Sequence, residues 1–252
     1  PFSVRWSGTL TPHLTEPFVF AATNRSIPSP TVSEHWNDQL GGVRIRLGGR
    51  LILDNWDGAN TRHRPQSKPI PLQAGKPYLL EVEYVFHGKD HPEFSLVWES
   101  VTQERQRIPE GLLQPVRPHE LPVVRIEAQG ALNESGKAEA TFVVMTDNAV
   151  PADLKVLLEP AGSAQPEDVS DVPAMVVIPA GSKRSAPVTV RAADDNVIDG
   201  PETFGFALQI DPGYVGDRST TVTLVPIIDD EAGPTKGLLA HFTFDRVRGN
   251  RA

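Results

Sequence analysis

Acidic residues gather at two places in this chain where a β-strand is expected to end. Asp194, Asp195, Asp199 and Glu202 fall within nine residues, between two strand-like runs, and Asp229-Asp230-Glu231 closes a third run. Two carboxylates about 4 Å apart repel each other by about 4 kcal/mol at an effective dielectric constant near 20. Calcium removes that repulsion, because it takes six to eight oxygen ligands from flexible loops. The two runs predict a calcium site, whereas one such run alone would favour a solvated acidic turn.

The charge is distributed unevenly along the chain. Residues 119–234 hold 7 Lys and Arg against 19 Asp and Glu, a net charge of −12, within a chain whose total is −8. Such an acidic segment repels phosphate backbones, which argues against nucleic acid as a partner.

The chain has no cysteine, which excludes disulfides, thiolate catalysis and cysteine-ligated zinc. No apolar run approaches the 18 residues typical of a membrane span.

The elements that must position these acids are expected to be β-strands throughout. The 24 prolines and 20 glycines leave no long helical period between them. Apolar and polar residues alternate with period two over residues 2–10, as they do in a half-buried strand. Residues 43–47 and 51–53 flank Gly48-Gly49, which is the signature of a β-hairpin with a two-residue turn.

Residues 1–115 resemble the protective-antigen-like (PA-fourteen) domain. The resemblance rests on Phe2–Gly8, Gly42–Ile45, Gly49–Trp56, Leu72–Tyr78 and Phe94–Trp98. It implies a β-barrel-like sandwich of secreted and surface proteins that binds carbohydrate, with its first strands missing ahead of Pro1. Adhesin members of this family chelate calcium with paired aspartates before the hairpin, where this chain has Leu40-Gly41-Gly42. The candidate sugar contacts are the loop aromatic and the polar residues at the hairpin end: Trp36, Asp54, Asn55 and Asp57.

A proline-rich linker is expected over residues 116–122, followed by a second all-β segment over 123–232. Seven candidate strands separated by turn residues fit an immunoglobulin-like sandwich. The segment resembles a Calx-beta domain through Asn133–Gly136, Gly162–Ala164, Pro179–Ser182, Ala193–Phe204 and Ile228–Glu231. That resemblance implies calcium ligands at Glu134, Asp168, Asp194, Asp195, Asp199, Glu202, Asp229, Asp230 and Glu231. The tail, residues 233–252, is expected to begin with a linker. The rest of it resembles the start of a laminin-G-like (concanavalin-like) domain.

Catalytic patterns are not found in this sequence. It contains no Gly-x-Ser-x-Gly nucleophile elbow and no phosphate-binding loop. Paired carboxylates can serve a glycosidase as acid and base, but here they cluster with no aromatic sugar platform near them in sequence. Trp6, Trp56 and Trp98 lie on expected strands and are interpreted as core residues, which leaves Trp36 as the candidate for an exposed aromatic.

The sequence thus predicts an all-β protein of two tandem β-sandwich domains, cut from a larger secreted or cell-surface protein. Its expected role is not enzymatic. It is to bind a carbohydrate or another cell-surface ligand through the first domain, beside a calcium-binding second domain, with neighbouring domains of the parent protein as partners. Two alternatives stay open: accessory domains of a carbohydrate-active or other secreted enzyme whose catalytic domain lies outside this chain, and a structural spacer without bound calcium.

Overall fold

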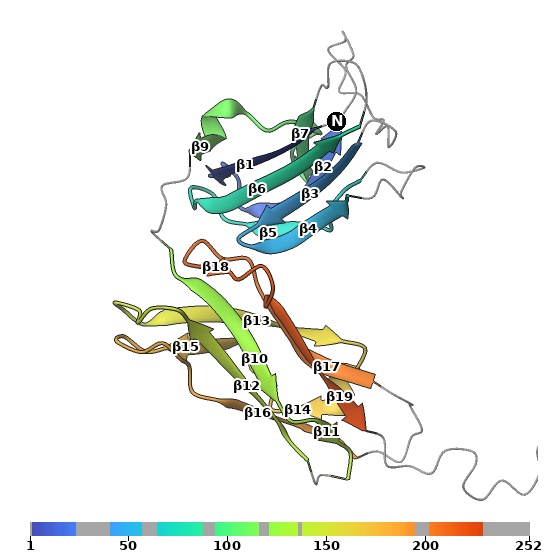
Figure 1. Ribbon diagram of the computed structural model, residues 1–252, viewed down its shortest axis with the longest axis vertical. Coiled ribbons are helices and arrows are strands. Elements are labelled where there is room, and N and C mark those ends of the chain that lie inside the picture. The colour runs from blue at the N-terminus through green and yellow to red at the C-terminus, as the bar shows by residue number, and fades with distance from the viewer. Residues whose placement is uncertain are drawn as a thin grey trace, which may run out of the picture.

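The protein folds into two β-sandwiches arranged one after the other along the chain (Figure 1). The computed structural model describes residues 2–23, 41–56, 65–87, 94–115, 121–135, 138–194 and 202–228. The described residues form strands with two short 3-10 turns, so the predicted all-β fold class is confirmed. None of the described helical segments is long or apolar enough to cross a bilayer.

The first sandwich consists of a five-stranded sheet, ordered β4-β3-β6-β1-β9, and a four-stranded sheet, ordered β5-β2-β7-β8. Its elements are β1 Phe2–Leu10, β2 Glu16–Thr23, β3 Gly41–Leu47, β4 Arg50–Asn55, β5 Ile70–Leu72, β6 Tyr78–Phe86, β7 Ser95–Ser100, β8 Gln106–Arg107, the 3-10 turn η2 Glu110–Leu112 and β9 Leu113–Pro115. All pairings between these strands are antiparallel.

Alternation of side chains along the strands builds the core of this sandwich. In β3, Val43, Ile45 and Leu47 are fully buried and alternate with the partly exposed Arg44 and Arg46. Such a pattern is expected for a strand with one face on the core and the other toward solvent. The neighbouring sheet contributes Trp98, which is fully buried and stacks on Phe18 with 4.4 Å between ring centroids.

The predicted hairpin is formed by β3 and β4. Gly48 and Gly49 have φ angles of 56° and 84°, which lie in the left-handed region that glycine adopts readily. Two consecutive positive φ values are the requirement of the tight hairpin turn that matches strand twist. The turn lies at one end of the first sandwich, and the residues that follow β4 lie at the other end of the same hairpin.

The second sandwich consists of two five-stranded sheets, ordered β14-β16-β12-β10-β18 and β11-β19-β17-β13-β15. Its elements are β10 Val123–Gln129, β11 Leu132–Asn133, β12 Ala140–Thr146, β13 Leu154–Gly162, η3 Pro166–Asp168, β14 Val169–Ser170, β15 Met175–Ile178, β16 Val188–Ala192, β17 Glu202–Leu208, β18 Val215–Gly216 and β19 Val222–Ile228. Phe142, Phe204 and Phe206 meet edge to face in its core, the arrangement that aromatic quadrupoles favour.

Tyr214 anchors the loop between β17 and β18 to the second core. Its side chain is 1% exposed, and its hydroxyl donates to the Gln209 carbonyl at 2.8 Å and accepts from the Leu157 N–H at 3.3 Å. Burial raises the pKa of Tyr214. The arrangement is like the tyrosine corner of immunoglobulin-like sandwiches, in which a buried hydroxyl closes a loop onto backbone a few residues upstream.

We expect Tyr214→Phe to lower the free energy of unfolding by about 1–2 kcal/mol, because the change removes the buried hydroxyl and both of its backbone hydrogen bonds. The measurement is the midpoint of urea unfolding, with an unchanged dependence of the free energy on denaturant. A midpoint equal to that of the unchanged chain would show that the hydroxyl does not hold this loop.

Candidate functional site

Four of the predicted calcium ligands lie within the described residues, and they form two pairs. Glu134 follows β11, is 5% exposed, and its N–H donates to the Ile228 carbonyl at 3.2 Å. Glu202 begins β17 and lies opposite Ile227 in the β17–β19 ladder. Both glutamates are therefore placed beside the last residues of β19. Asp229, Asp230 and Glu231 follow β19 in sequence and lie outside the described residues.

The second pair, Asp168 and Asp194, lies at the end of the sheet that contains β14 and β16. Asp168 closes η3, and its carboxylate accepts a hydrogen bond from the Gln165 N–H as part of a capping box. Its carbonyl accepts from the Ala193 N–H at 2.8 Å, which brings Asp168 next to the residue that precedes Asp194. Asp195 and Asp199 lie outside the described residues.

The segment between β13 and η3 connects the two pairs. The N–H groups of Ser163 and Ala164 donate to the Thr203 carbonyl at 3.0 and 3.1 Å, and Thr203 follows Glu202 directly. Figure 1 shows β11, β14 and the end of β19 gathered at the end of the second sandwich that lies away from the first. We call this end, with Glu134, Asp168, Asp194 and Glu202, the acidic pole. Within the described ranges, no three His, Cys, Asp or Glu side chains are grouped closely enough to hold a metal ion.

A second group of polar and aromatic side chains lies at the strand ends of the β3–β4 hairpin. Arg44 lies opposite Asp54, and its Nε donates to both carboxylate oxygens at 3.0 and 3.1 Å. The same guanidinium lies 5.0 Å from the ring centroid of Trp56, a cation–π distance. Asp54 also accepts from the Trp56 N–H at 3.1 Å. We call Arg44, Asp54, Asn55 and Trp56 the hairpin-base site.

Asn55 is the buried member of this site. The residue is 6% exposed, and its Nδ2 has no hydrogen-bond partner in the part of the chain that the structure describes. A buried donor without a partner costs about 1–3 kcal/mol. Asn55 lies opposite the fully buried Val43 on the core-facing side of β4, whereas Asp54 lies on the exposed side. The other two predicted sugar contacts, Trp36 and Asp57, lie outside the described residues.

The roles of the tryptophans differ from their sequence interpretation in two cases. Trp98 is a core residue, as predicted. Trp6 is 46% exposed and stacks on Phe94 at 5.4 Å, so its assignment to the core was wrong. Trp56 is partly exposed beneath Arg44. Sequence reasoning missed Arg44 as a site residue, although its position opposite Asp54 in the hairpin register could have indicated the pair.

Comparison with known proteins places the hairpin-base site within a named domain type. Residues 39–111 match the PA14 domain. The match includes β3, β4, β6 and β7 and every residue of the hairpin-base site. The Calx-beta and laminin-G resemblances are outside this match, and the tail that carries the second of them lies outside the described residues.

The chain is also similar to the anti-sigma-I factor RsgI3 of Acetivibrio thermocellus, with 34% identity over 109 residues. That alignment covers 43% of this chain and 14% of the relative, so the chain spans a small part of the length of the curated protein it matches. A solved anti-sigma factor domain-containing protein from Clostridium clariflavum aligns over 89% of this chain and 82% of its own, at 16% identity and a TM-score of 0.35. A second solved anti-sigma factor domain-containing protein aligns over 85% and 84%, at 14% identity and a TM-score of 0.34.

Proposed function

We propose that this chain is a non-catalytic ligand-binding tandem from a secreted or cell-surface multidomain protein, and that its first sandwich binds carbohydrate. One observation carries the proposal: the PA14 match contains the hairpin-base site, where Asp54 accepts from both Arg44 and the Trp56 N–H and Arg44 lies over the Trp56 ring. An aromatic face beside fixed polar groups is the usual composition of a small-molecule site. Trp36 and Asp57 complete the proposed site.

The name of one relative supports a proposal about the parent protein. RsgI3 is called an anti-sigma-I factor, and the alignment with it covers 43% of this chain. We propose that the parent protein is a regulator of that kind and that the tandem is its ligand-binding part. The second sandwich is proposed to be a Calx-beta domain that binds calcium at the acidic pole, and the tail to begin a laminin-G-like domain.

We expect Trp56→Ala to weaken carbohydrate binding at least tenfold, because an aromatic face in a binding site contributes more than the 1.4 kcal/mol that corresponds to a factor of ten. Trp36→Ala is expected to have a similar effect. The measurement is a glycan array, followed by titration of the best ligand against each variant.

Trp6→Ala is the matched control, because Trp6 is 46% exposed on the same sandwich but does not belong to the hairpin-base site. Binding that survives both Trp56→Ala and Trp36→Ala would place the sugar elsewhere. An array without any bound glycan would remove carbohydrate as the ligand class.

A further inference from the structure

The hairpin turn of the first sandwich contacts one loop of the second. We call residues 209–221 the docking loop; it contains β18 and lies between the two sandwiches in Figure 1. The Gly216 N–H donates to the Gly48 carbonyl at 2.8 Å. A Cβ atom on Gly49 would lie 1.9 Å from the Gly216 carbonyl oxygen, and one on Gly48 would lie 3.2 Å from Ile210 Cγ2. The two backbones therefore approach as closely as adjacent strands do, and a side chain at Gly49 would separate them.

Beside this backbone contact, a buried carboxylate of the first sandwich is bound by an arginine of the second. Glu81 lies on β6, and its side chain is 8% exposed. Arg218 of the docking loop donates from Nε to Glu81 Oε2 at 3.1 Å and from Nη2 to Oε1. Two parallel bonds from one guanidinium fix both the distance and the angle between the partners.

Glu81 needs the positive charge of Arg218 because its carboxylate is buried. Burial raises the pKa of the Glu81 carboxyl, and the positive charges of Arg5 and Arg46 oppose that shift. Arg5 donates to Glu81 Oε1 from the neighbouring strand β1. An ionised carboxylate that is buried costs several kcal/mol unless it is paired, and removing one partner of such a pair is costly. The second sandwich thus supplies part of the charge balance of the first.

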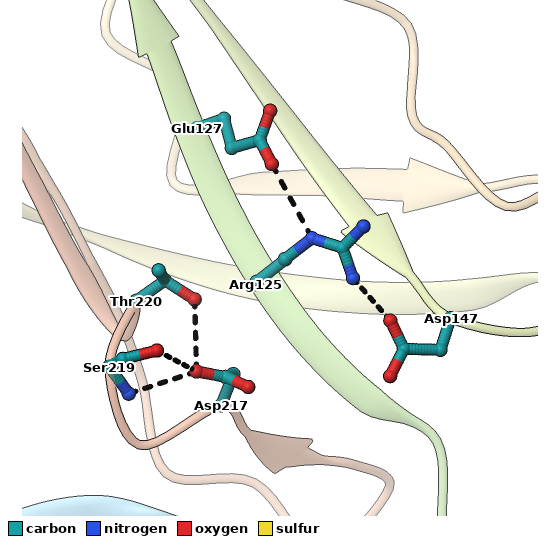
Figure 2. Close-up of polar contacts among 6 residues, drawn as sticks. All are labelled: Arg125, Glu127, Asp147, Asp217, Ser219 and Thr220. Atoms are coloured by element: carbon teal, nitrogen blue, oxygen red, sulfur yellow. Dashed lines mark hydrogen bonds and ion pairs between the residues drawn. The ribbon is translucent and has the colours of Figure 1, made fainter.

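The docking loop is held in shape before it meets the first sandwich (Figure 2). Asp217 Oδ1 accepts from the Ser219 N–H at 2.9 Å, from the Ser219 hydroxyl at 2.5 Å and from the Thr220 hydroxyl at 3.3 Å. These bonds, the Ser219 hydroxyl foremost, lower the pKa of Asp217. The Asp217 N–H also donates to the Val124 carbonyl of β10 at 2.7 Å. Because the residue before Arg218 is held by these hydrogen bonds, little backbone entropy is lost when the guanidinium meets Glu81.

Single substitutions can test this contact. A cleft of about 490 Å³ opens next to it, lined by residues of both sandwiches that include Arg50, Glu159 and Ile210. The ion pair between Arg50 and Glu159 crosses this cleft at 2.7 Å, with both side chains partly exposed. Exposed pairs contribute at most about 1 kcal/mol, so the glycine contact and the Glu81–Arg218 pair carry the docking.

We propose that the Gly48–Gly49 turn and Glu81 form a docking face for the docking loop, with Arg218 as the residue that sets the angle between the sandwiches. The tandem then tumbles in solution as one rigid body instead of two domains joined by a free linker. The hairpin-base site and the acidic pole are held at a fixed separation and orientation. This proposal requires neither a sugar nor a calcium ion.

The first test inserts a methyl group between the two backbones. In the full chain, residual dipolar couplings of both sandwiches should fit a single alignment tensor, whereas Gly49→Ala should require two tensors and shorten the rotational correlation time of each sandwich. Gly75→Ala is the matched control. Gly75 has a similar positive φ of 72°, but a Cβ there meets no atom within 4 Å. Both variants therefore place a β-carbon on a residue with a positive φ and strain the backbone there. Only Gly49→Ala also obstructs the docking.

The second test removes the guanidinium. Arg218→Ala should also require two tensors, and it leaves Arg5 beside Glu81, so the first sandwich keeps a counter-charge. Arg125→Ala is its control, because Arg125 lies on β10 of the same sandwich and pairs with Glu127 and Asp147 instead (Figure 2). One tensor for Gly49→Ala and Arg218→Ala alike would overturn the proposal, as would two tensors for the unchanged chain. If Gly49→Ala fails to fold, Arg218→Ala decides.

Discussion

Millimolar calcium should raise the melting temperature of the chain by about 5–10 °C over a sample that contains a chelator. A ligand that binds only the folded state at a hundred times its dissociation constant adds about 2.7 kcal/mol of stability. For 150–250 residues that unfold together, each kcal/mol corresponds to about 2–4 °C. The effect is expected because nine of the 19 acids in residues 119–234 occupy the proposed ligand positions. Scanning calorimetry with and without chelator gives the shift.

Two comparisons make this calcium result specific. Magnesium should stabilise much less, because it demands near-ideal octahedral geometry and gives up its waters reluctantly. Replacing Asp194 and Asp195 together by Asn should abolish the shift and stabilise the calcium-free chain, because repulsion at the acidic pole falls. Replacing Glu127 and Asp147 by Gln and Asn changes the net charge equally at exposed positions away from the pole and should leave the shift intact. Superimposable melting curves in calcium and chelator would contradict the proposed site and favour the spacer interpretation.

Trp98→Ala should lower the free energy of unfolding of the first sandwich by about 3–5 kcal/mol, the range for truncation of a large buried aromatic. Trp98 is fully buried, stacks on Phe18 and also contacts Phe20 and His13. The cavity left behind lies between sheets that are fixed by their hydrogen-bond ladders, so it cannot collapse completely. Denaturant unfolding followed by circular dichroism measures the loss.

Trp6→Ala serves as the comparison within the same sandwich. It removes an equally large side chain that is 46% exposed and in contact with one ring, that of Phe94, so the loss of stability should be much smaller. Equal losses for the two tryptophans would show that burial does not determine their contributions.

The strands with a clear alternation were predictable from sequence, and the shortest ones were not. The β3–β4 hairpin follows from alternating Val43, Ile45 and Leu47 and from a turn that two glycines permit. By contrast, β8, β11, β14 and β18 have two residues each, too few to show any period. Their existence depends on the partner strand that lies beside them, and that information is not local.

Candidate sites were predictable to the extent that their chemistry is local in the sequence. Asp54 and Asn55 end a recognisable strand, which is why they could be proposed. Arg44 joins them only through the register of the hairpin. Trp6 was misassigned because its alternation is that of a buried strand, whereas its exposure depends on how far neighbouring elements extend. The contact between Glu81 and Arg218 joins residues 137 positions apart, and no pattern in either segment indicates the other.

Docking of the two sandwiches limits how such domains can be exchanged between proteins. If residues 1–115 were transplanted alone into another chain, they would carry Glu81 with one guanidinium fewer and a glycine turn whose carbonyl acceptor site is empty. Glu81 would keep Arg5 but lose the two hydrogen bonds from Arg218, so the transplanted domain would be less stable than in its own chain. A graft that brings the docking loop with it would keep the hydrogen bonds from Arg218 and from the Gly216 N–H.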